Sequence, residues 1–265
     1  MKDKLWRVAV MAAIVAIAWF GGTPEGLKPQ VWHLFGIYLA TIVGLVLKPF
    51  PVPITVLLGV ATSSILLNNV KDVLVGYSNT ALWLIFAAFA LSVAFGKTGL
   101  GHRIAYHLVR AFGSTTLRLG YVTAFLDLIL SPATPSNTAR AAGIVYPINL
   151  SIAEAVGSHP GETAKKAGAY LLQNGYFATK VTSFLFATAM APNYLALDFV
   201  TKLTGVSLNW GQWALAMFVP GLIMLMFIPL IGYMYERPSV KEIDNKKIAA
   251  DGLAELGPMK GSEKG

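Results

Sequence analysis

Six stretches of the 265-residue chain are apolar over nearly the ~20 residues that a helix needs to cross a lipid bilayer. Only 13% of the residues are charged, about half of the roughly 25% typical of a soluble domain. A segment in lipid must satisfy its own backbone hydrogen bonds, which favours helices. We therefore predict an all-α, polytopic integral membrane protein with about six transmembrane helices. The expected spans are Trp6–Phe20, Val31–Leu47, Val52–Leu67, Ala81–Phe95, Ala164–Met190 and Trp213–Tyr235.

The basic residues predict how the chain is oriented. With the N-terminus in the cytoplasm, 16 of the 21 Lys and Arg residues fall inside, whereas only Lys28, Lys71 and Lys202 fall outside. Arg140 and Lys180 are left at membrane depth. This bias predicts cytoplasmic N- and C-termini and explains the net charge of +8 without a nucleic-acid partner. The first span lacks a cleavage pattern, and no Arg/Ser-rich transit segment precedes it, so we expect a multi-pass protein of a bacterial inner (plasma) membrane.

The residue types argue against enzymatic chemistry. The chain has no Cys, which excludes disulfide scaffolds, thiolate metal sites and a cysteine nucleophile. The four His residues do not form a metal-binding pair of the HExxH kind. No nucleophile–base constellation is visible either. We expect no enzyme, no cofactor apart from a possible sodium ion, and a lipid bilayer as surroundings.

The predicted orientation requires that segment 119–156 makes no net crossing. Its two apolar arms are interrupted by Ser131–Thr138, which contains Pro132 and Pro135. At 1.5 Å per residue, a first arm of about 14 residues reaches only ~21 Å, short of the ~30 Å hydrocarbon core. The segment is therefore expected to be a re-entrant helical hairpin that enters from the cytoplasm and turns near mid-membrane.

The tip of this hairpin carries Ser136, Asn137 and Thr138. One of these residues is expected to cap the second arm, because Pro132 and Pro135 stop the first. Free backbone N–H groups there attract carboxylates, and the side-chain oxygens suit a small cation. Half-helix ends that meet near the midplane are a recurring feature of secondary transporters. The alternative is a capped kink between two packed helices.

A second interruption follows in the long run that begins at Ala164. Pro192 and Asn193 lie near its end, so carbonyls around Met190 and Ala191 are expected to be freed and to ligate the same cation. Asn193 is expected to cap a short continuation of the helix. The alternative is an ordinary exit from the membrane.

Two charged residues flank the first tip. Asp127 and Arg140 lie within a few residues of it on opposite arms, and a lone charge in lipid is costly, so we predict an intramembrane ion pair. The alternative is that Arg140 contacts an anionic substrate. Lys180 is assigned no role. A second Ser-Asn-Thr, at 78–80, lacks the Pro-rich break and is interpreted as a helix N-cap.

These features divide the chain into four parts. Residues 1–118 hold scaffold-type transmembrane helices and a cytoplasmic amphipathic helix after Lys97. Residues 119–156 form the hairpin, and residues 164–235 form the broken helix and the final transmembrane helix. Residues 236–265 form a cytoplasmic tail or linker, with one short helix near Ile248–Leu256.

Several pieces in order resemble the divalent anion:sodium symporter family, in its branch of di- and tricarboxylate translocators. The pieces are Ala81-Leu-Trp-Leu-Ile-Phe, Lys97–Tyr106, Thr134–Arg140, Tyr146-Pro-Ile, Gly168-Ala-Tyr-Leu and Thr188–Asn193. The resemblance implies secondary transport of anions such as malate, 2-oxoglutarate, citrate, tartrate or succinate, by sodium symport or by carboxylate exchange. It also implies inverted repeats, each with one hairpin, and a homodimer.

Carried over, the resemblance places Asn137 and Thr138 against a substrate carboxylate, and Ser136 and Asn137 in a sodium site that the break near Ala191 completes. We therefore expect substrate binding by Ser136, Asn137 and Thr138, and cation binding by Ser136, Asn137, Ala191 and Asn193. Members of the family are nearly twice as long and have a second hairpin, so the chain is expected to be an N-terminal half, for which a complementary C-terminal half is the expected partner. Alternatives are a non-transporting remnant, a docking partner of a full-length homologue, or a transporter of another anion.

Overall fold

The computed structural model describes residues 2–259, and it describes their side chains except at positions 2, 3, 81, 88 and 91–97. The end of the predicted tail, 260–265, and the side chains of Ala81 and Lys97 lie outside the described residues. The described part is all-helical, with one isolated bridge between Thr115 and Glu242. The α-helices are α1 (Lys2–Phe20), α2 (Pro29–Leu47), α3 (Val52–Leu66), α4 (Val70–Leu74), α5 (Thr80–Thr98), α6 (Leu100–Phe112), α7 (Thr116–Leu130), α8 (Asn137–Arg140), α9 (Tyr146–Ala155), α10 (Gly168–Leu185), α11 (Ala191–Thr204), α12 (Trp210–Glu236) and α13 (Asn245–Leu256). The shorter segments are the 3-10 turns η1 (Val75–Ser78), η2 (Ser131–Ala133), η4 (Ala164–Lys166) and η5 (Ala187–Ala189), and the π-helix η3 (Ala141–Val145).

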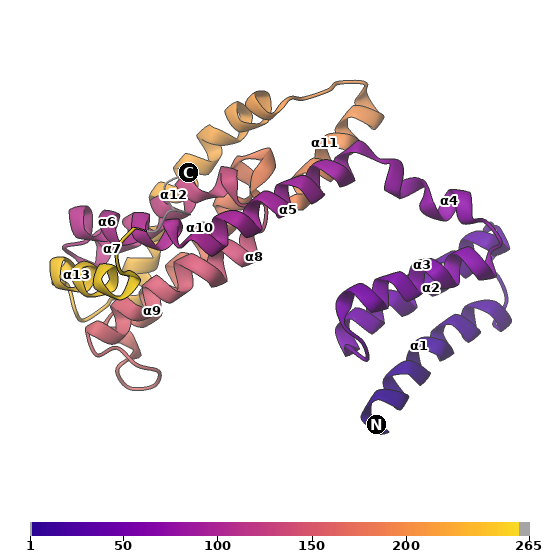
Figure 1. The fold of residues 1–265 in the computed structure, drawn as a ribbon, viewed down its shortest axis with the longest axis horizontal. Coiled ribbons are helices and arrows are strands. Elements are labelled where there is room, and N and C mark those ends of the chain that lie inside the picture. Colours follow the sequence, from indigo (N-terminus) through magenta and orange to yellow (C-terminus); the bar gives the residue numbers. More distant parts are fainter. Residues whose placement is uncertain (1, 260–265) are drawn as a thin grey trace. The chain divides into compact units, whose positions relative to one another are not determined.

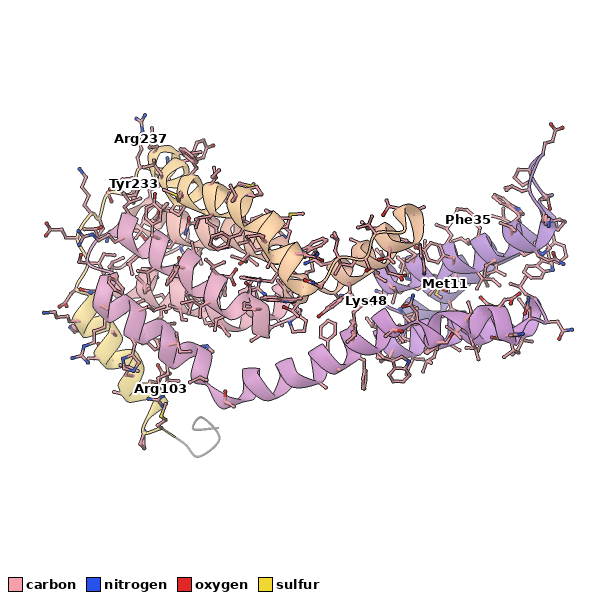
Figure 2. The ribbon with its side chains drawn as sticks, turned by 90° about the horizontal axis from the view of Figure 1, so that it is seen from above. Met11, Phe35, Lys48, Arg103, Tyr233 and Arg237 are labelled. Carbon is pink, nitrogen blue, oxygen red and sulfur yellow. The ribbon has the colours of Figure 1, made fainter. Side chains whose placement is uncertain are left out.

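The chain divides into two compact units, residues 1–82 and 83–265. In the first unit, α2 packs against both α1 and α3 (Figure 1). Small residues allow this close approach, because a side chain at Gly36 would collide with Ala18 and one at Gly44 would collide with Met11. Met11, labelled in Figure 2, points from α1 into this contact. The Arg7 guanidinium Nη1 donates to the carbonyl of Leu47 over 2.8 Å and so ties α1 to the end of α2.

Two helices of the described part are long and apolar enough to cross a membrane, α2 and α12, and the apolar helix α3 is shorter. Large apolar side chains on α12 point outward, among them Leu215, Val219 and Met226, which are 77%, 62% and 60% exposed. Such a surface is typical of a lipid contact rather than of a water-exposed face. The expected long run 164–190 is divided, since α10 ends at Leu185. The count of six spans therefore stays a prediction.

The second unit has a larger core cluster among α6, α7, α9, α10 and α13 and a smaller one among α7, α10 and α12. Tyr170 of α10 is 1% exposed, and its hydroxyl donates to the carbonyl of Pro229 in α12 over 3.1 Å. A Cβ atom at Gly120 would lie 1.9 Å from that hydroxyl, so only glycine lets α7 approach Tyr170. The ring of Tyr233, near the end of α12 in Figure 2, meets the Tyr170 ring edge-on at 5.5 Å.

The segment after α12 packs against the rest of this unit. Its helix α13 lies against the amphipathic helix α6, where Gly252 leaves room for the ring of Tyr106. Asn245 Nδ2 donates to the last carbonyls of α6, those of Val109 and Arg110, over 2.9 Å each. Arg103, which lies beside α13 in Figure 2, donates to the carbonyl of Gly257 over 3.0 Å. The short helix expected near Ile248–Leu256 is thus α13, and it is docked rather than free.

Candidate functional site

The first break in the helices is the tip between α7 and α8. The chain leaves α7 through the turn η2, which contains Pro132, and re-enters a helix at Asn137. Ser136 has an extended backbone, and its Oγ accepts a hydrogen bond from the N–H of Ala139 over 3.2 Å. Ser136 is therefore the residue that caps the second arm. The hydroxyl of Thr138 donates to Asn137 Oδ1 over 3.4 Å.

The second break separates α10 from α11. The backbone is extended at Phe186 and Met190, on either side of the turn η5, and helical again from Ala191. The structure thus places the unwound residues before Ala191, because Pro192 stands at the second position of α11, where a proline is tolerated. The carbonyl of Ala191, which we expected to be freed, lies in the first turn of a helix.

Asn193 closes the end of α10 rather than the start of α11. Its Nδ2 donates to the carbonyls of Ser183, over 2.7 Å, and of Phe186, over 3.0 Å, and the side chain is buried. Trp213 Nε1 donates to a third carbonyl there, that of Phe184, over 2.9 Å. These contacts satisfy carbonyl groups that the broken helix leaves without intrahelical partners.

The two breaks lie against each other, since η2 packs on η5. A buried ion pair joins them. Arg140 Nε lies 2.6 Å from Asp127 Oδ1, and the two side chains are 0% and 1% exposed. Arg140 Nη1 donates to the carbonyls of Thr134, over 2.9 Å, and Ala189, over 3.4 Å. Its Nη2 donates to Thr182 Oγ1 over 3.1 Å, and the Thr182 hydroxyl in turn donates to the other oxygen of Asp127.

This network occupies all three nitrogens of the guanidinium. The alternative expectation, that Arg140 contacts a substrate, does not fit this arrangement, because the group is enclosed and its charge is balanced by Asp127. A buried charge pair is tolerable when further hydrogen bonds satisfy its remaining donors and acceptors. Arg140 therefore connects α7, the first tip, α10 and the second break.

The π-helix η3 follows Arg140 directly and was not predicted. It covers Ala141–Val145, where the small residues Ala141, Ala142 and Gly143 accommodate the wider turn. Single π turns inside helices are uncommon and occur frequently at functional sites. No sequence signal that we used distinguishes such a turn from an ordinary α turn.

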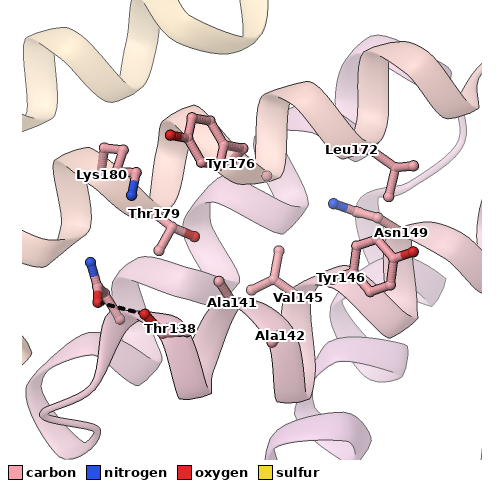
Figure 3. Close-up of a pocket in the computed structure, with 12 residues that line it drawn as sticks. Thr138, Ala141, Ala142, Val145, Tyr146, Asn149, Leu172, Tyr176, Thr179 and Lys180 are labelled. Atoms are coloured by element: carbon pink, nitrogen blue, oxygen red, sulfur yellow. Dashed lines mark hydrogen bonds between the residues drawn. The ribbon is translucent and has the colours of Figure 1, made fainter. Parts of the chain in front are cut away.

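A pocket of about 400 Å³ lies between the second arm of the hairpin and α10. Figure 3 shows Thr138 on one side of it and Thr179 and Lys180 on the other. Asn137 also lines the pocket, whereas Ser136 does not. The structure therefore brings two of the three predicted substrate residues to one cavity. The full lining is Asn137, Thr138, Ala141, Ala142, Val145, Tyr146, Asn149, Leu172, Gly175, Tyr176, Thr179 and Lys180.

Sequence reasoning missed the polar groups that α9 and α10 contribute to this pocket. Lys180 lines it, as do the buried residues Asn149 and Thr179. Asn149 Oδ1 and Thr179 Oγ1 have no hydrogen-bond partner among the described residues. A charged residue within a predicted span was the available signal for Lys180. Within the described residues, no group of three or more acidic or His side chains is placed to hold a metal ion.

The second Ser-Asn-Thr, at 78–80, runs from the last residue of η1 to the first residue of α5. Ser78 closes η1, because its hydroxyl donates to the carbonyl of Val75 over 2.6 Å. Neither this serine nor its two successors line the pocket beside Thr138.

A family model described as the sodium:sulfate symporter transmembrane region matches residues 2–265. The inner membrane protein YbhI of Escherichia coli (strain K12) is 52% identical over 270 residues, which are 99% of this chain and 57% of that protein. The putative malate transporter YflS of Bacillus subtilis (strain 168) is 45% identical over 98% of this chain and 55% of its own length. The citrate/succinate antiporter of E. coli (strain K12) is 33% identical over 97% of this chain and 57% of its own length.

The chain therefore spans less than two thirds of the length of these relatives. The names of the matched family and of the relatives describe transporters and membrane proteins. This agrees with the expectation of an integral membrane protein that is not an enzyme.

Proposed function

Because the chain belongs to the sodium:sulfate symporter family of membrane transporters, we propose that the whole protein carries di- or tricarboxylate anions across the cell's inner (plasma) membrane. The mechanism is secondary active transport, in which binding and alternating access replace covalent chemistry. The observation that carries the proposal is the pocket beside the hairpin tip, where Asn137, Thr138 and Lys180 share one cavity.

The polar groups of this pocket suit a carboxylate. Asn137 offers amide N–H donors, Thr138 offers a hydroxyl, and Lys180 offers an ammonium group. The remaining walls are largely apolar and suit the carbon skeleton of a small organic acid. Ser136 stays a proposed substrate residue of the complete site, although its hydroxyl caps α8 here.

Sodium coupling is proposed at the junction of the two breaks. Hard cations such as sodium take oxygen ligands. The candidates are Ser136 Oγ, Asn137 Oδ1, the side-chain oxygen of Asn193 and backbone carbonyls next to Ala191. Exchange of two carboxylates without sodium is the alternative form of the same transport, and two relatives are named as antiporters.

We propose the orientation in the membrane that the distribution of basic residues predicts. We propose cytoplasmic N- and C-termini, a hairpin over 119–156 that enters from the cytoplasm, and an assembly with a second set of helices or a second copy of the protein. The exposed apolar side chains of α12 provide a surface for lipid or for such a partner.

Uptake into proteoliposomes tests the proposal. Purified protein is reconstituted, and entry of labelled succinate, malate, citrate and sulfate is compared with and without an inward sodium gradient, and with and without internal succinate. We expect carboxylate uptake that unlabelled carboxylates suppress. Dependence on the sodium gradient indicates symport, and dependence on internal succinate indicates exchange. Uptake of sulfate alone would contradict carboxylate transport, and correct insertion without any uptake would favour a non-transporting membrane protein.

A further inference from the structure

Lys180 is the only charged side chain among the residues that line the pocket beside the hairpin tip. It is exposed, and it lies in the second half of α10. A charged residue within a membrane-embedded helix is expensive and usually marks a substrate or ion pathway. Packing alone therefore does not explain why a lysine occupies this position.

No carboxylate among the described residues balances the charge of Lys180. The ion pairs in that part of the chain join Asp127 to Arg140 and Asp198 to Lys202. Lys180 Nζ instead lies over the ring of Tyr176, 4.7 Å from its centre. A ring holds the ammonium by cation–π attraction, and it leaves N–H donors free on the side that faces away from it.

The donors opposite Lys180 come from the hairpin. Figure 3 shows the Lys180 side chain reaching from α10 towards the arm that carries Thr138. Next to it, the buried Thr179 hydroxyl has no partner among the described residues. Buried hydroxyls without a partner are rare, so Thr179 is an unusual polar residue in the wall beside Lys180.

The two cations of this region, Arg140 and Lys180, differ in how enclosed they are and in whether they form an ion pair. Arg140 is enclosed and neutralised by Asp127, so it adds no net charge to the pocket. Lys180 lines the pocket, is exposed, and forms no ion pair among the described residues. The pocket thus has amide and hydroxyl groups on one wall and an ammonium on the other, and the rest of its lining is largely apolar.

We propose that Lys180 determines the specificity of this pocket by binding one carboxylate of a dicarboxylate whose other carboxylate contacts Asn137 and Thr138 at the hairpin tip. The proposal rests on the carboxylate transport function given above. A monocarboxylate of the same length occupies only one of the two sites, and Lys180 distinguishes the two kinds of acid.

Binding to the purified protein in detergent tests this assignment. Affinities for succinate and for butyrate, which share a four-carbon skeleton, are measured by calorimetry at fixed ionic strength for the wild type, Lys180→Gln and Lys180→Arg. Lys202→Gln is the matched control, because Lys202 is a 59% exposed lysine outside the pocket. Thermal unfolding of each variant verifies that it is folded.

We expect Lys180→Gln to weaken succinate binding by roughly tenfold or more, which is about 1.4 kcal/mol, and to leave weak butyrate binding unchanged. Lys180→Arg keeps the charge and most of the affinity, and Lys202→Gln changes neither ligand. Equal succinate affinity in wild type and Lys180→Gln would overturn the role of Lys180 and leave carboxylate transport standing. If sulfate binds and needs Lys180, but succinate does not bind, the pocket is an anion site whose ligand is not a carboxylate. Absence of anion binding to a folded wild type would overturn both.

Discussion

Arg140 Nε lies 2.6 Å from Asp127 Oδ1 in the enclosed space where the two helix breaks meet. Asp127 belongs to the arm before the hairpin tip and Arg140 to the arm after it. The same guanidinium reaches the second break through the carbonyl of Ala189. Buried ion pairs are weak evidence for stability in themselves. The pair instead matters for geometry, because it holds the hairpin tip against the end of α10. The pocket lies between these two parts of the chain.

Removing one partner of this pair should therefore lower the stability strongly, and removing both should cost less than the two separate losses added together. Asp127→Asn and Arg140→Met each leave a buried charge without its partner, which typically lowers the free energy of unfolding by about 3–5 kcal/mol. The double variant should lose clearly less than the sum of the two. Unfolding in detergent measures the coupling between the sites.

The exposed pair between Asp198 and Lys202 is the control for this cycle. Its Nζ–Oδ2 distance is 2.7 Å, but the two side chains are 25% and 59% exposed. Asp198→Asn and Lys202→Met should each change the stability by less than about 1 kcal/mol. Stability losses below about 1 kcal/mol for Asp127→Asn and Arg140→Met would contradict the expected cost of breaking the buried pair.

Gly120→Ala is predicted to destabilise the second unit. The added methyl would lie 1.9 Å from the hydroxyl and 2.7 Å from Cζ of Tyr170, whose ring is enclosed between α7 and α12. Overpacking of this kind costs about 1–3 kcal/mol. Gly143→Ala is the control, because a methyl there meets no atom within 4 Å, and thermal unfolding of both variants gives the comparison. Equal melting temperatures for the two would show that α7 does not depend on this close approach.

Asn193→Ala removes the donors that close α10. The carbonyl of Ser183 loses its side-chain partner, whereas that of Phe186 still accepts from the N–H of Ala189. An unsatisfied buried polar group costs about 1–3 kcal/mol. Asn193→Asp keeps a side-chain oxygen but cannot donate, so it should be destabilised as well. Sodium-dependent stabilisation, measured by thermal unfolding with sodium or choline chloride, separates the two roles of Asn193. Asn193→Asp retains a sodium response if the side-chain oxygen is a ligand, and Asn193→Ala loses it. A response preserved in Asn193→Ala would exclude Asn193 from the ion site.

His102 on α6 predicts a dependence of stability on pH. Burial lowers the pKa of His102 below its ordinary value of 6.5. The unfolded chain therefore binds a proton at this position more readily than the folded chain does. The contribution of His102 to the free energy of unfolding is fully present above about pH 6.5. It is lost as the pH falls through the lower folded-state pKa. Between pH 8 and pH 5, the melting temperature should depend less on pH for His102→Gln than for the wild type. Parallel curves for wild type and His102→Gln would contradict this explanation.

The sequence was informative about where the helices break. Pro132 and Pro135 place the first break, and Ser136 is a residue type that caps helices, so these features follow from local chemistry. The helical class follows from the apolar composition. The need for a partner for Asp127 could be inferred too, because two opposite charges flank the same tip.

Other parts of the site depend on contacts that local patterns do not contain. Thr182 and Ala189 join the Arg140 network only because η5 packs on η2. The unwinding begins at Phe186, several residues before the proline that suggested it, because Asn193 and Trp213 satisfy the exposed carbonyls from a distance. Lys180 faces the pocket because of the way α10 packs against residues 137–149, and this orientation depends on tertiary packing.

The most direct measurement of the central claim is carboxylate uptake by Asn137→Ala compared with Asn79→Ala. Both variants lose the central residue of a Ser-Asn-Thr, but only Asn137 lines the pocket. We predict that Asn137→Ala in proteoliposomes loses most of the wild-type succinate uptake, at matched protein content, and that Asn79→Ala retains it. Retained uptake in Asn137→Ala, or equal losses in the two variants, would contradict the assignment of the hairpin tip as the substrate site.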